Sequence, residues 1–104
     1  MKDYLVRLSA KDRSILTPKL LEGHVNHLRS LDEKGHLRVC GPCEDGTAVL
    51  ILRADSRSSV EELVSADPFV SRGFYRERKI LEFTSAEQGN NFLFDQVNFP
   101  AETR

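Results

Sequence analysis

The sequence predicts an α+β fold of the ferredoxin-like type, a βαββαβ sandwich whose single antiparallel sheet carries two helices on one face. Two observations support it: strand-like alternation recurs at four places, and two helical patterns with capping residues separate them. The simplest solution has the strand order 4-1-3-2 and belongs to the dimeric α+β barrel type.

Composition limits the classes of function. The chain has 104 residues, enough for one domain, and a net charge of −1. Without a basic excess, a nucleic-acid partner is disfavoured. The N-terminus lacks the apolar core of a signal peptide, and no apolar run reaches the length of a membrane span. Two cysteines without an export signal predict free thiols and a cytoplasmic location.

The first half of the chain predicts a strand, a helix and a hairpin. Residues 2–8 alternate as a strand does, and residues 9–14 are polar and indicate a loop. Thr17 and Pro18 open a helix that runs to Lys34, with Gly35 placed for a left-handed cap. Strands over 36–40 and 47–54 flank an Asp-Gly turn.

The second half predicts one more helix and strand. Ser58 and Ser59 each precede a glutamate by three residues, which favours a helix start there, and Pro68 is expected to end that helix. Residues 74–83 read as an edge strand rich in charge. We therefore expect a domain over 1–84 and a tail over 85–104 that docks on the core or on a partner. The apolar residues of that tail are Phe92, Leu93, Phe94, Val97 and Phe99.

The strand over 47–54 also predicts a homodimer. Its centre, AVLIL, is apolar on both faces, whereas a strand with one wet face would alternate. Two helices cover one face of the sheet only. A second copy of the chain is the simplest cover for the other face.

Two interpretations of Cys40 and Cys43 stand as alternatives. A redox CxxC motif usually has a helix N-terminus beneath its first cysteine, but here a turn and another strand follow. A zinc site would need further ligands from His24, His27 or His36. The favoured interpretation is a hairpin turn that happens to carry two thiols. His36 is expected to point off the outer sheet face.

His24 and Asp67 are the candidate catalytic residues. His24 lies in the middle of the apolar arc of the first helix, and Asp67 continues the inner face of the second helix at its C-terminus. A carboxylate there faces the negative end of the helix dipole and needs a partner. The predicted topology brings both residues to one rim of the sandwich. The carboxylate would then fix the imidazole tautomer and prepare it for acid–base catalysis. His27 is expected at the surface.

These residues in this order resemble the YCII-related family: His24 and Gly35, the Gly41-Pro42 step, the Asp45-Gly46 turn and the Asp67-Pro68-Phe69 step. The resemblance covers residues 1–84. It implies a dimeric ferredoxin-like domain with a His–Asp site, and one relative is a dehydrochlorinase of a chlorinated hydroxyquinol. Relatives often carry an arginine where this chain has Leu21, so a cationic anchor for an anionic substrate is missing.

We therefore expect an enzyme that performs cofactor-independent acid–base chemistry, of the lyase, dehydrochlorinase or isomerase type, on a small molecule. His24 would be the acid or base and Asp67 would orient it. Gly41, Pro42 and Phe69 are expected to line the pocket, and no metal is expected. The alternatives are a non-catalytic domain that binds a small ligand and, third, a dithiol redox protein.

Overall fold

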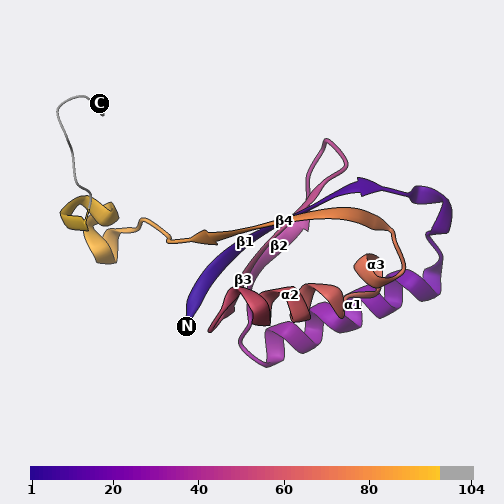
Figure 1. The fold of residues 1–104 in the computed structure, drawn as a ribbon, viewed down its shortest axis with the longest axis horizontal. Helices are drawn as coiled ribbons and strands as arrows, with labels where there is room; N and C mark the ends of the chain where they lie inside the picture. The colour runs from indigo at the N-terminus through magenta and orange to yellow at the C-terminus, as the bar shows by residue number, and fades with distance from the viewer. Residues whose placement is uncertain (97–104) are drawn as a thin grey trace.

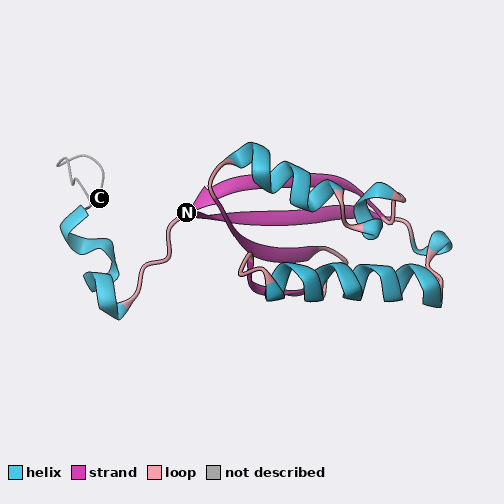
Figure 2. Cartoon of the chain, turned by 90° about the horizontal axis from the view of Figure 1, so that it is seen from below, coloured by secondary structure: helices cyan, strands magenta, loops and turns pink. Residues whose placement is uncertain are grey.

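The computed structural model describes residues 1–96 and confirms the predicted α+β sandwich. Four antiparallel strands form one sheet in the order β2-β3-β1-β4, which is the predicted order. Figure 1 shows the helices along one face of that sheet, and Figure 2 shows the same layers turned by 90°. The strands are β1 (Lys2–Lys11), β2 (Leu37–Pro42), β3 (Ala48–Ala54) and β4 (Tyr75–Phe83). The helices are α1 (Pro18–Glu33), α2 (Arg57–Ser65) and the short α3 (Pro68–Ser71), with 3-10 turns over Arg13–Ile15 and Gln88–Gln96.

Strand β1 is longer than the sequence predicts. It continues to Lys11, where Ser9 pairs with Glu77 and Lys11 pairs with Tyr75. Polar residues tolerate this extension because the added segment pairs with β4 alone, at the margin of the sheet. Ala10 has a positive φ of 57°, so the inward–outward alternation of the strand breaks there.

The hairpin between β2 and β3 turns later than expected. Gly41 and Pro42 belong to β2 instead of the turn, so the four-residue CxxC segment is mostly strand. The Cys43 N–H donates to the Thr47 carbonyl at 2.8 Å, and Gly46 takes a φ of 87°. The predicted Asp-Gly turn is thus confirmed, and only Cys43 of the CxxC segment belongs to it.

The caps of the helices match the sequence at α1 and differ at α2. Thr17 Oγ1 accepts a hydrogen bond from the Leu20 N–H at 3.0 Å, as expected of an N-cap. The N-cap of α2 is Ser56, which accepts from the Ser59 N–H at 3.2 Å. Ser58 and Ser59 therefore lie inside the first turn, and the prediction that the helix starts at them was wrong.

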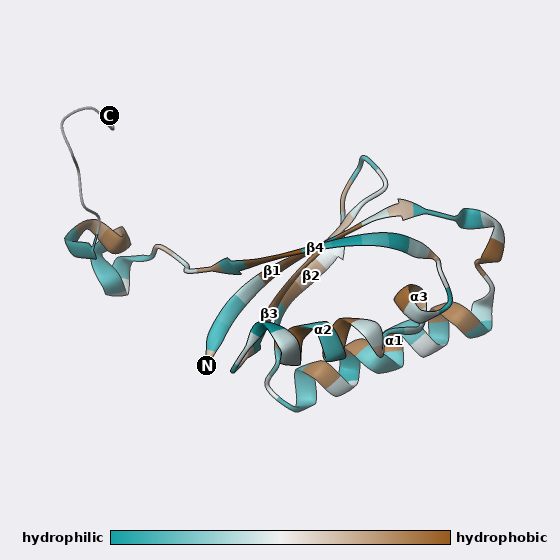
Figure 3. Cartoon of the chain, in the orientation of Figure 1, coloured by the Kyte–Doolittle hydropathy of each residue, from teal (hydrophilic) through white to brown (hydrophobic). Residues whose placement is uncertain are grey.

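The core lies between the sheet and the helices. Val6, Leu52 and Val60 are fully buried and come from β1, β3 and α2. Figure 3 shows the apolar stretches of the central strands β1 and β3. This layer holds α1 and α3 in place over the end of the sheet where the candidate residues meet.

The other face of the sheet is apolar at its centre, and none of the described helices covers it. Leu5 pairs with Ile51 on one side and Leu81 on the other, and Val39 pairs with Ile51. Val39 and Leu81 are about half exposed. These four residues are called the outer apolar face below.

A charged group borders the outer apolar face at one end. The Asp3 carboxylate accepts from Arg38 at 2.7 Å and from Arg53 at 3.2 Å. Burial raises the pKa of the Asp3 carboxyl, but the bonds from the two guanidinium groups outweigh it and hold the pKa below its ordinary value. Asp3 therefore stays charged at neutral pH.

The tail leaves the sandwich after β4. Figures 1 and 2 both show Gln88–Gln96 apart from the sheet and helices, and Phe92 is 61% exposed. Val97 and Phe99 lie outside the described residues. Within residues 1–96, no helix combines the length and apolar character needed to cross a bilayer.

Candidate active site

The structure brings His24 and Asp67 together, although 43 residues separate them in the sequence. His24 Nδ1 lies 2.9 Å from one Asp67 carboxylate oxygen and 3.0 Å from the other. An ionised carboxylate only accepts hydrogen bonds, so Nδ1 carries the proton and donates it. In the neutral form of the ring, Nε2 is then the nitrogen without a proton, and it forms no hydrogen bond with any described residue. A nitrogen in this state can accept a proton.

Asp67 is held differently from what the sequence suggests. It was expected to end α2 against the helix dipole, but α2 ends at Ser65 and Asp67 is the N-cap of α3. Its Oδ1 accepts from the Phe69 N–H at 2.9 Å, and its side chain is almost fully buried. The carboxylate thus meets the positive end of a short helix, and Pro68 opens that helix instead of stopping the previous one.

The imidazole ring of His24 is fixed by packing as well as by its hydrogen bond. It stacks on Phe69, with ring centroids 3.8 Å apart and an interplanar angle of 3°. Beside it, α1 passes close to α3 at Gly23, where an added Cβ would lie 3.3 Å from Pro68 Cγ. The close approach of the two helices therefore depends on a residue without a side chain at position 23.

A cavity of about 370 Å³ opens beside this pair, between α1 and the strands. It includes three residues that the sequence singled out for the wall: Gly41, Pro42 and Phe69. The polar side chains on it are His24, Cys40 and Tyr75, and neither lysine nor arginine lines it. The rest of the lining is apolar: Leu8, Leu21, Val25, Leu28, Ala48, Val49 and Leu50. Such a cavity favours a single-ring organic molecule over a small, highly charged anion.

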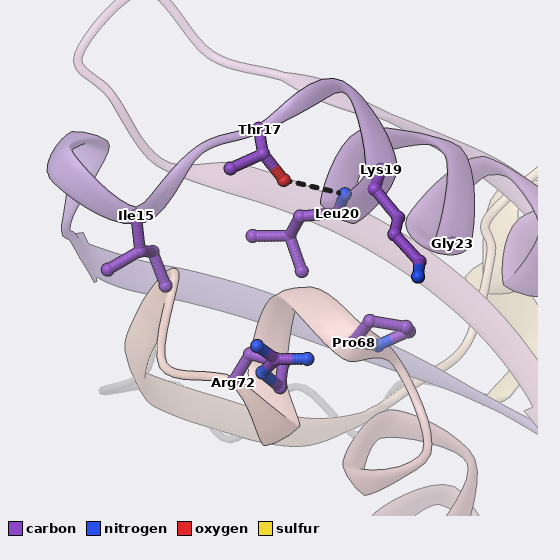
Figure 4. A pocket seen from close by; sticks show the side chains of 7 residues that line it. All are labelled: Ile15, Thr17, Lys19, Leu20, Gly23, Pro68 and Arg72. Carbon is purple, nitrogen blue, oxygen red and sulfur yellow. Dashed lines mark hydrogen bonds between the residues drawn. The ribbon is translucent and has the colours of Figure 1, made fainter.

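A second cavity, of about 350 Å³, lies between the start of α1 and α3. Figure 4 shows Lys19 and Arg72 beside it, together with the Thr17 hydroxyl that caps α1. Ile15 and Leu20 form part of its apolar wall. Neither His24 nor Asp67 lines this cavity, so it is separate from the candidate site.

The other two histidines have structural roles. His27 was expected at the surface, but it is half-buried and its Nε2 lies 2.9 Å from the Leu63 carbonyl, which ties α1 to α2. His36 Nδ1 lies 2.8 Å from the Arg53 carbonyl. Within residues 1–96, no three histidine, cysteine or acidic side chains gather as metal ligands would.

Both cysteines are free thiols, and they differ in position. Cys40 lines the candidate cavity and Cys43 lies in the hairpin turn outside it. Burial, followed by the negative charge of Asp67, raises the pKa of the Cys40 thiol. A redox cysteine needs the opposite shift, so Cys40 is a neutral thiol at physiological pH.

Sequence reasoning missed two residues of this site. Both Tyr75 and Cys40 line the cavity, whereas the sequence assigns no role to Tyr75 and only redox or zinc chemistry to Cys40. The sequence signal for Tyr75 points away from the cavity, because alternation along β4 places Tyr75 on the same face as the half-exposed Leu81.

Comparison with known proteins identifies a family and similar solved structures. The family model of the YCII-related domain matches residues 4–84. No curated protein matches the chain. Among solved structures, the fold resembles 5-chloro-2-hydroxyhydroquinone dehydrochlorinase from Burkholderia phenoliruptrix AC1100, in complex with 2,5-dihydroxybenzoquinone. The TM-score is 0.65 at 22% identity, over 79% of this chain and 93% of that one, and at this identity the likeness shows the fold alone.

Proposed function

This chain belongs to the YCII-related family, and we propose that its cavity performs cofactor-independent acid–base chemistry on a small hydroxylated ring compound. The observation that carries the proposal is the buried carboxylate of Asp67, which holds the His24 proton on Nδ1 and leaves Nε2 free beside an apolar cavity. The structural relative that acts on a chlorinated hydroxyhydroquinone supports this class of substrate.

The proposed reaction is the loss of a hydrogen halide from a halogenated, hydroxylated ring. Nε2 of His24 takes the proton of a ring hydroxyl and returns it to the ring carbon that bears the halogen. A second hydroxyl then loses its proton while the carbon–halogen bond breaks and the halide leaves. The products are a hydroxyquinone, a proton and a halide ion, so the atoms balance without an external oxidant.

The test is halide release from 5-chloro-2-hydroxyhydroquinone by the purified full chain. We expect stoichiometric chloride and a quinone absorbance that rise together. If the chain binds 2,5-dihydroxybenzoquinone but releases no chloride from the substrate, the non-catalytic binding domain is the correct interpretation. The variant Cys43→Ser tests the redox alternative, because it removes the dithiol without altering a residue that lines the cavity. A dithiol redox protein would lose its activity in this variant.

We also propose that the chain is a cytoplasmic homodimer with a core domain over 1–84, and that the tail over 85–104 docks on the second copy. The outer apolar face supports the dimer, because burying its apolar side chains against a second copy removes them from water, which is favourable. These side chains are Leu5, Val39, Ile51 and Leu81. Two free thiols support a reducing compartment.

Light scattering at micromolar concentration is expected to give twice the mass of one chain. Leu81→Asp places a charge on the outer apolar face and should shift the mass to that of a monomer. The matched control is Leu16→Asp, because Leu16 is 43% exposed against 45% for Leu81 but lies away from the sheet. A monomeric wild type, or a dimer that tolerates Leu81→Asp, would contradict the proposal.

A further inference from the structure

Tyr75 is the one tyrosine on the candidate cavity, and its ring is held rigidly. The residue opens β4 and is 5% exposed. Its ring packs edge-on against Phe69 at 6.0 Å and against Phe74 at 5.0 Å between centroids. Lys11 Nζ lies 5.8 Å from the centroid of the same ring. Phe69 in turn stacks on His24, so one aromatic group fixes both polar side chains.

The hydroxyl of Tyr75 has no partner within the part of the chain that the structure describes. Yet no buried side-chain oxygen or nitrogen in residues 1–96 lacks a hydrogen bond. The hydroxyl is therefore not sealed in the core, although the ring is. Tyr75 lines the candidate cavity and also an open hollow beside Arg72 and Arg76. Asp67 and Cys43 act electrostatically on the hydroxyl, and Pro42 and Phe69, their neighbours in the chain, line the candidate cavity, so the hydroxyl lies on that side. A buried tyrosine normally satisfies its hydroxyl, and here a ligand can do so.

The surroundings of the hydroxyl favour its neutral form. Burial raises the pKa of Tyr75, and the negative charge of Asp67 and the nearby Cys43 add to the effect. The group therefore keeps its proton throughout the neutral range. It can donate a hydrogen bond and cannot itself serve as a base.

We propose that the Tyr75 hydroxyl donates a hydrogen bond to a ring oxygen of the substrate, a phenolate or a quinone carbonyl, while His24 Nε2 acts on the same ring. The inference rests on the proposed function and makes it more specific. The cavity offers a donor at Tyr75, a proton acceptor at His24 and otherwise apolar walls with one neutral thiol. This arrangement selects a ring with oxygen substituents over an unsubstituted ring of the same size.

Electron density that develops on the ring oxygen during deprotonation strengthens the bond to Tyr75. A donor fixed in a poorly hydrated site stabilises such charge without reorganising. Lysine and arginine are absent from the lining, so Tyr75 is the strongest donor that the described cavity provides. Tyr75 therefore takes the place of the cationic anchor that is missing in this chain, which has Leu21 at that position.

The test uses 4-nitrophenol as the probe, at a pH where the free probe is ionised and its absorbance reports binding. Tyr75→Phe removes only the hydroxyl and keeps the aromatic packing. A hydrogen bond to a charged group predicts an affinity for the phenolate that is about ten- to a hundredfold weaker in this variant. Nitrobenzene, which lacks the ring oxygen, is expected to bind both proteins equally.

Tyr4→Phe is the matched control, because Tyr4 is the other tyrosine of the chain and is buried outside the cavity. It should bind 4-nitrophenolate as the wild type does. Equal phenolate affinity in the wild type and Tyr75→Phe, or no binding to the wild type, would overturn the inference. Chloride release is an independent measurement, so acid–base catalysis can fail while phenolate recognition stands, and the reverse.

Discussion

His24→Ala is expected to slow chloride release from 5-chloro-2-hydroxyhydroquinone by about 10²- to 10⁴-fold. The substitution removes the nitrogen that carries the proton between a ring hydroxyl and a ring carbon, and no other described base lines the cavity. The turnover number should fall, and the affinity for 2,5-dihydroxybenzoquinone should change much less, because the walls of the cavity remain. Steady-state kinetics with a chloride assay measure the first, and absorbance titration measures the second.

His27→Ala is the matched control for that experiment. His27 lies on the same helix, three residues further on, and contacts the Leu63 carbonyl away from the cavity. Its loss removes one hydrogen bond, with a cost of about 1 kcal/mol in the free energy of unfolding. We expect its turnover number to stay near that of the wild type. If His24→Ala and His27→Ala turn over equally fast, His24 is not the base.

Asp67→Asn is expected to lower turnover by about 10²- to 10⁴-fold while the fold remains stable. The amide oxygen can still cap α3 through the Phe69 N–H, and asparagine is as good an N-cap as aspartate. The amide nitrogen would then take the place of Oδ2, 3.0 Å from His24 Nδ1, where its N–H favours Nδ1 as an acceptor. The proton moves to Nε2, so the nitrogen that faces the substrate can no longer accept one.

Thermal unfolding should show that Asp67→Asn changes the free energy of unfolding by no more than about 1 kcal/mol. Asp67→Ala should lower the free energy of unfolding by about 1–3 kcal/mol. The alanine variant loses the cap and leaves the His24 N–H without its acceptor. This pair of variants separates catalysis from stability. An asparagine variant that keeps full turnover would show that the tautomer of His24 is irrelevant to the reaction.

The fold and the proximity of His24 to Asp67 could be predicted because both follow from the periodic patterns of helices and strands. Alternation gave the strands, and the order of elements placed His24 near Asp67. The role of Asp67 could not be predicted. A four-residue helix such as α3 is too short to show a periodic pattern, so Pro68 looked like the end of one helix when it begins another.

The remaining parts of the site depend on tertiary contacts that no local pattern reveals. A helical wheel shows the angle of His27 on α1 but not the Leu63 carbonyl of α2 that it meets. Alternation along β4 would place Tyr75 on the same face as the half-exposed Leu81, yet Tyr75 is buried. Neither placement can be read from the sequence pattern of a single helix or strand.

The contact between Gly23 and Pro68 has a consequence for how this site can vary. Gly23 precedes His24 in the chain and Pro68 follows Asp67, so the point where α1 and α3 touch adjoins both catalytic candidates. A methyl group at position 23 would displace Pro68 by a few tenths of an ångström, next to the hydrogen bond between His24 and Asp67. A substitution at position 23, which does not line the candidate cavity, could therefore alter the basicity of His24 in evolution or design.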